Sequence, residues 1–120
     1  MNPPDDGTKI YDMAYATCWI DEDGIFNTVT KYGPYTVEAT KEHVELSMSI
    51  LGGKKAFVLC DFSKGGYIDK HIRKYIRENG RKVYGAFAIL ADSALGKVMG
   101  KILLALMPSS VPTRIFTKEE

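Results

Sequence analysis

Hydrophobic and polar positions along the chain follow patterns that predict five β-strands. Two runs rich in β-branched and aromatic residues flank Asp23-Gly24, a dipeptide typical of hairpin turns. Two later runs are almost continuously apolar, as expected for strands that are buried on both faces. The strands are expected at about residues 14–21, 25–31, 55–62, 84–92 and 111–117.

Helical spacing of apolar side chains predicts three helices between these strands. The first follows Thr36, a good N-cap, and should stop at Gly52-Gly53. The second starts after Asp69 as N-cap and should close at Asn79-Gly80. Asp92 or Ser93 can cap the third, which Pro108 should end. The apolar stripe of this third helix consists of Leu95, Val98, Met99, Ile102, Leu103 and Leu106.

The order β-β-α-β-α-β-α-β predicts an α/β fold. Strands joined by helical crossovers should be parallel and the crossovers right-handed, which gives a mixed five-stranded sheet with the first strand as an antiparallel edge. We expect residues 1–120 to form one domain, with residues 1–9 as a loose N-terminal segment. A further helix could begin at residues 118–120.

Composition narrows the function classes. The 120-residue chain is 45% hydrophobic and carries a net charge of only +1, which argues against bulk electrostatic binding to nucleic acid. The apolar run at residues 102–106 is far too short to span a bilayer, so we expect a cytoplasmic protein. Cys18 and Cys60 lie far apart inside apolar runs, a pattern typical of buried thiols in a reducing compartment. We expect no metal and no cofactor.

Candidate binding residues gather where parallel strands end, because ligand and partner sites in α/β sheets lie at the carboxyl ends of the strands. The expected set is Asp61, Ser63, Lys64, Asp69, Lys70, His71, Ser93 and Lys97. Features of this region also have purely structural interpretations. Asp69 can serve as an N-cap, and Gly65-Gly66 can form a turn with positive φ. His43 and His71 are interpreted as surface histidines, Ser63 has no recognisable partner histidine, and no catalytic residue is predicted.

The second helix is strongly basic. It and the residues after it carry Lys70, Arg73, Lys74, Arg77, Arg81 and Lys82 against only Glu78. A solvated helix face would explain this pattern, and so would a docking surface for an acidic partner or headgroup. Arg73 follows Ile72 of the inner face and is expected to bond to Asp61 or to a helix end.

The stretch from residue 58 to 76 resembles STAS domains, found in anti-sigma factor antagonists and sulfate transporters. In those domains an apolar strand ends near Asp or Asn, and a short loop leads to a helix start of the form Ile/Met-Asp-Ser-Ser-Gly. Here Asp61 precedes Ile68-Asp69 by a similar interval. The chain is most similar to the small bacterial SpoIIAA-like (STAS/SEC14) group, through Asp61, Arg73, "AFAIL" at residues 86–90, and Pro112 followed by Phe116. The resemblance covers about residues 14–120 and lacks the group's tryptophan-bearing terminal segment.

The helix start departs from the antagonist pattern. Antagonists place a phosphorylatable serine directly after the aspartate, whereas here Lys70 and His71 follow Asp69. The resemblance therefore implies a non-catalytic interaction or regulatory module without that serine, with a protein partner or another copy of itself. The binding residues are then the strand-end set together with Arg73, Lys74 and Arg77.

Two other functions remain open at this level. One is a small-ligand protein that binds an apolar or anionic metabolite or lipid between helices and sheet, in a pocket lined by Met48, Met99, Met107 and Tyr75. The other is an enzyme that would use Asp61, Asp69 and His71, although no supporting pattern accompanies them. The aromatic-rich first strand also makes a homodimer plausible, because exposed edge strands pair readily.

Overall fold

The strands of the computed structural model, which describes residues 1–117, form one six-stranded mixed sheet in sequence order. β1 and β2 are antiparallel, as are β2 and β3, whereas β3, β4, β5 and β6 run parallel. The bounds are β1 Tyr11–Asp12, β2 Ala16–Ile20, β3 Phe26–Thr30, β4 Ala56–Asp61, β5 Tyr84–Leu90 and β6 Thr113–Phe116.

The α/β class and the mixed sheet are confirmed, but the expected count of five strands is wrong. The additional strand is β1, which pairs with residues 17 and 18 of β2. A two-residue strand has no alternation to recognise, and only the partner strand organises it. The expected first strand is therefore β2, and it lies between β1 and β3 instead of at the sheet edge.

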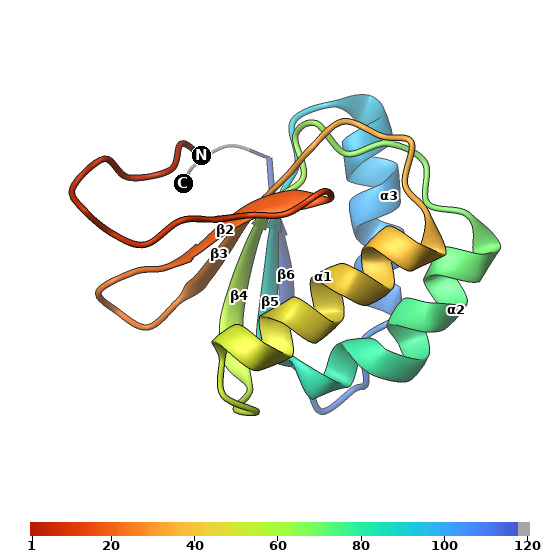
Figure 1. Ribbon diagram of the computed structural model, residues 1–120. Helices are drawn as coiled ribbons and strands as arrows, with labels where there is room; N and C mark the ends of the chain where they lie inside the picture. The colour runs from red at the N-terminus through yellow and green to blue at the C-terminus, as the bar shows by residue number, and fades with distance from the viewer. Residues whose placement is uncertain (118–120) are drawn as a thin grey trace.

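Three helices connect the parallel strands, and all three cover the same face of the sheet (Figure 1). This follows from the topology, because right-handed crossovers between strands added in one direction always return over the same face. The bounds are α1 Val37–Ile50, α2 Lys70–Asn79 and α3 Ala94–Ala105, and a short 3₁₀ turn, η1, follows α2 at Gly80–Lys82.

The helix starts are confirmed at the residues that the sequence predicted. Thr36 accepts a hydrogen bond from the Ala39 N–H, and Asp69 accepts from the N–H groups of His71 and Ile72. Of the two candidates for the third cap, the structure uses Ser93, which accepts from the Gly96 N–H. Each cap satisfies backbone donors that a helix start leaves without intrahelical partners.

The glycines divide into two kinds. Gly52 and Gly53 have φ of 63° and 79° and stop α1 as expected. Gly65 does not have positive φ, so that expectation is wrong. It is required by close packing, because a Cβ atom there would lie 2.2 Å from the Phe62 ring. The helix expected from residue 118 onward lies outside the described residues.

The register assigns side chains to the two faces of the sheet, because alternate residues point to opposite sides. The helix-covered face carries one row across four strands: Cys18, Thr28, Cys60 and Ile89. The adjacent row on the opposite, helix-free face consists of Trp19, Asn27, Leu59, Ala88 and Arg114.

The core fills the space between the helices and the covered face, and both cysteines lie buried in it as free thiols. Cys18 and Cys60 are two strands apart, roughly 9–10 Å, which is too far for a disulfide. Burial raises the pKa of the Cys18 thiol to about 12. Both thiols therefore behave as small apolar core residues.

Candidate functional site

The loops that follow β4 and β5 meet at one edge of the sheet, which we call the rim and define as residues 63–71 and 92–98. The two segments approach each other closely at two points. The Ile68 N–H donates to Met99 Sδ at 3.4 Å, and a Cβ atom on Gly96 would lie 3.0 Å from the Phe62 carbonyl oxygen. The carboxyl ends of β4 and β5 are therefore neighbours at this edge of the sheet.

Tyr35 anchors the first of these loops, a role that sequence reasoning missed. Its hydroxyl donates to the Lys31 carbonyl at 2.7 Å and accepts from the Gly66 N–H at 3.1 Å. The ring is buried and packs against Tyr15, with centroids 4.8 Å apart. A tyrosine two residues after a glycine carries no sequence signal for this contact, because its partner lies 31 positions further along the chain.

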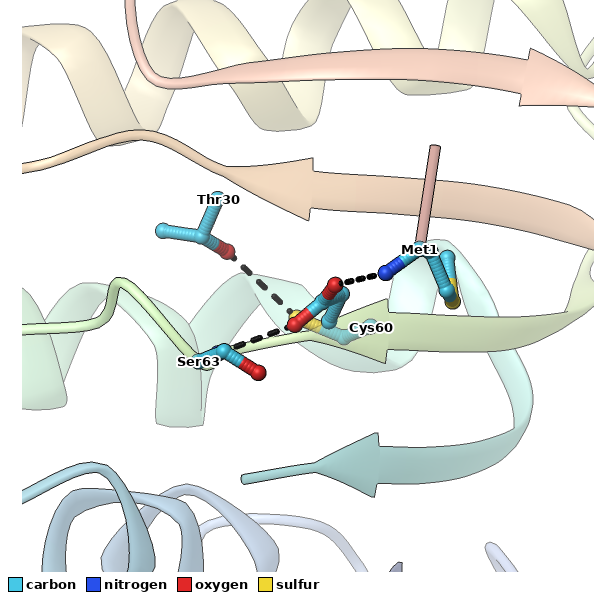
Figure 2. Close-up of polar contacts among 5 residues, drawn as sticks. Met1, Thr30, Cys60 and Ser63 are labelled. Carbon is cyan, nitrogen blue, oxygen red and sulfur yellow. Dashed lines mark hydrogen bonds and ion pairs between the residues drawn. The ribbon is translucent and has the colours of Figure 1, made fainter. Parts of the chain in front are cut away.

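The Asp61 side chain lies on the helix-free face of the sheet, apart from the other predicted binding residues. Its carboxylate accepts from the Met1 ammonium at 2.5 Å and from the Ser63 N–H at 3.0 Å (Figure 2). Burial by itself raises the pKa of Asp61, but the Met1 ammonium and the Ser63 donors outweigh it and hold this pKa below its usual value. The next residue back, Cys60, points into the core, where its sulfur lies 3.5 Å from Thr30 Oγ1.

Arg73 bonds to the start of the helix and not to Asp61. Its guanidinium donates to the Ile68 carbonyl at 2.6 Å, just before the Asp69 cap. Of the two partners expected for this half-buried arginine, the structure uses the backbone near the helix end. Arg73 therefore braces the β4–α2 loop and contributes its charge at the side of the rim.

The remaining predicted residues lie on the rim or on the exposed side of α2, next to it. Lys64, Lys70, His71, Lys74 and Arg77 are exposed, whereas Lys97 is half-buried. Lys64 Nζ lies 5.5 Å from the centroid of the exposed Tyr32 ring. Asp69 and Ser93 serve as helix caps, which confirms their structural interpretation.

Large apolar side chains on the rim are exposed, and the sequence prediction placed two of them in the core. Leu95 and Val98 are 47% and 54% exposed, and Tyr67 is 63% exposed. The apolar stripe on α3 is wider than the helix can bury, since Met99 and Leu103 face the sheet. Exposed apolar side chains that form a patch are typical of a contact surface for another molecule.

The basic side chains of α2 are not neutralised by neighbours. Among residues 1–117, no carboxylate forms an ion pair with Lys70, Lys74 or Arg77. Glu78 on α2 itself and Glu38, Glu42 and Glu45 on α1 are exposed, and within residues 1–117 none of them forms an ion pair with these three side chains. We define the rim surface as the exposed apolar side chains of Tyr67, Leu95 and Val98 together with the cations Lys70, Lys74 and Arg77 of α2, which form no ion pair within residues 1–117.

A small internal cavity lies between the covered face of the sheet and the helices, and its polar groups were not predicted. A bulge between β4 and β5 turns Tyr84 toward this space, where it joins Tyr15, Thr28 and His43. His43 was interpreted as a surface residue; in fact its Nδ1 is buried and has no hydrogen-bond partner among residues 1–117, and burial lowers its pKa to about 4.

The size of this cavity limits what it can hold. Its volume is about 40 Å³, enough for one to about three water molecules and too small for a metabolite. The expected pocket residues Met48, Met99, Met107 and Tyr75 do not line it. The described part of the chain also has no group of three or more His, Cys, Asp or Glu that could hold a metal ion.

Comparison with known proteins assigns the chain to a family. The model of a domain of unknown function (DUF7793) matches residues 18–120, and the chain therefore belongs to this family. No curated protein and no solved structure matches the chain. Within residues 1–117, no helix has the length and apolar character needed to cross a bilayer.

Proposed function

We propose that the protein is a non-catalytic, STAS-like interaction module in the cytoplasm that binds an acidic protein partner through the rim surface. The observation that carries this proposal is the combination of Tyr67, Leu95 and Val98, all exposed, with the unpaired cations of α2. Exposed apolar side chains supply the buried centre that a protein interface needs, and the surrounding charges select and orient the partner.

The character of the rim supports binding over catalysis. Asp69 and Ser93 are occupied as helix caps, and Asp61 lies on the other face of the sheet. The three side chains considered for an enzyme, Asp61, Asp69 and His71, therefore do not face one another across a common site. The two buried thiols would remain reduced in the cytoplasm.

Site-specific photocrosslinking in cells that express the chain natively tests the proposal. A photoreactive phenylalanine analogue at Val98 should yield one discrete adduct, because a bound partner covers this position. The same analogue at Phe57, which is also exposed but lies on the helix-free face, is the matched control and should not yield that adduct.

Charge reversal provides the second half of the test. Lys70→Glu, Lys74→Glu and Arg77→Glu together should abolish the Val98 adduct, because an acidic partner is then repelled. Lys54→Glu with Lys55→Glu, two exposed lysines before β4, should leave the adduct intact. Equal adducts at Val98 and Phe57, or an adduct that survives the triple reversal, would rule out the rim as the acidic-partner site.

A further inference from the structure

The helix-free face of the sheet carries a shallow groove that the rim proposal does not involve. Ala86 and Ala88 on β5 form its floor. Phe57 and Leu59 of β4 flank one side of this floor, and the β6 side is formed by Pro112, Arg114 and Phe116. The volume is about 430 Å³. We call this feature the alanine groove, because the two small side chains between larger neighbours create it.

The groove leaves apolar surface uncovered where a parallel sheet normally has none. Parallel sheets occur almost always with both faces covered. Here the N-terminal segment lies on the helix-free side (Figure 1), and Trp19 and Asp61 on this face are buried. Phe57, by contrast, remains 68% exposed. The groove and its walls are therefore an open apolar part of this face.

The size of this open area favours a small molecule as the ligand and argues against a second copy of the chain. Three strands about 4.8 Å apart and five residues of about 3.3 Å each give a face of roughly 14 by 17 Å, or about 250 Å². A stable protein interface needs about 800 Å² on each partner. The groove volume, in contrast, falls within the range of about 300–1,000 Å³ that is typical of small-molecule sites.

The charge at the groove selects the class of molecule. Among residues 1–117, Arg114 is the one charged residue that lines the groove, and its guanidinium lies 4.8 Å from the centroid of the Phe116 ring. No carboxylate within residues 1–117 forms an ion pair with it. A guanidinium held beside an apolar trough matches a ligand with an apolar body and a carboxylate head, which Arg can bind through two parallel hydrogen bonds.

We propose that the alanine groove binds a medium-chain aliphatic carboxylate, with its chain along Ala86 and Ala88 and its head group on Arg114. The site lies on the face opposite the helices, whereas the sequence pointed to a pocket between helices and sheet. It is independent of the rim surface, so either site can be tested while the other is intact.

Titration calorimetry with sodium decanoate, kept below its micelle concentration, tests the proposal. The wild-type chain should show saturable binding of one decanoate. Ala88→Leu should abolish binding, because the new side chain fills the floor of the groove. Arg114→Gln should weaken it at least tenfold, while Arg81→Gln, an exposed arginine after α2, should not change it.

Two further measurements test whether the variants remain folded and whether the carboxylate is needed for binding. Thermal melts should show that Ala88→Leu remains folded, since the substitution adds atoms on an open face; if that variant does not fold, Ala88→Val serves in its place. Decanol should bind at least tenfold more weakly than decanoate. Absence of saturable binding up to 1 mM or unchanged affinity in Arg114→Gln would overturn the proposal.

Discussion

At the scale of single residues, His43 shows how tertiary packing changes the character of a side chain. Its neighbours Lys41, Glu42 and Glu45 are exposed and indicate a solvated helix face. The imidazole nevertheless turns inward and packs against Tyr15, with ring centroids 5.4 Å apart. Its Nδ1 is buried, and the residue lines the small cavity between the helices and the sheet.

The low pKa of His43 predicts a specific pH dependence of stability. Its folded-state pKa of about 4 lies below the unfolded value of about 6.5, so the unfolded chain takes up the proton first as the pH falls. The stability that the neutral imidazole confers is therefore present above pH 6.5 and lost as the pH drops toward 4. Between pH 7.5 and pH 5, the free energy of unfolding should fall by about 2 kcal/mol from this group alone.

Urea unfolding of His43→Leu at the two pH values checks this expectation. The variant should lose most of the difference between pH 7.5 and pH 5, because the titrating group is gone. His71→Gln, which removes an exposed histidine, should retain the wild-type difference. An unchanged pH dependence in His43→Leu would show that this imidazole titrates equally in both states.

At the scale of elements, the β4–α2 loop depends on one glycine for packing and tolerates change at the next. A Cβ atom on Gly65 would lie 2.2 Å from the ring of Phe62, which is fully buried. On Gly66 the nearest neighbour would be Tyr35 at 3.7 Å, an ordinary van der Waals distance. Neither glycine has positive φ, so backbone strain is the same in both cases.

The two alanine substitutions should therefore differ in stability. Gly65→Ala should lower the free energy of unfolding by about 1–3 kcal/mol, because the Phe62 ring must shift in a packed core. Gly66→Ala should be close to neutral. Chemical denaturation of the two variants side by side checks this contrast. Equal losses in the free energy of unfolding would contradict the role of the Phe62 contact.

At the scale of the whole molecule, the ion pair between Met1 and Asp61 ties the N-terminal segment to the centre of the sheet. The partners are 60 residues apart, and Asp61 is buried. The surface pair of Lys31 and Asp12 has the same N–O separation of 2.5 Å, but its side chains are 40% and 76% exposed. Water and salt screen the second pair far more than the first.

Asp61→Asn should consequently destabilise the protein by roughly 1–3 kcal/mol at pH 7, because a buried charge-assisted contact is lost. The folded-state pKa of Asp61 lies below its unfolded value, so this stabilisation exists above about pH 4 and disappears as the pH falls further. Wild type and variant should therefore converge near pH 2 in thermal melts. Asp12→Asn is the matched control and should have a much smaller effect; equal losses would contradict the role of burial.

Local features of the chain determined the element order, the helix caps and the hairpin turn. Asp69 caps α2 with its own side chain, and Gly24 adopts the positive φ that its turn requires. These features depend on contacts within about four residues, so the sequence displays them directly. The α/β class followed for the same reason, because the order of strands and helices limits the connections that can form.

Tertiary structure alone decided which candidate residues share a surface. Asp61 lies two residues before the rim in sequence, yet the alternation of the strand sends its carboxylate to the opposite face. The sequence pattern places Leu95 and Val98 in the apolar stripe of α3, but the helix buries Met99 and Leu103 instead. The alanine groove consists of residues from three strands and becomes visible only in their register. Contacts between residues that are distant in the chain carry no local pattern, and they determine which side chains lie together on one surface.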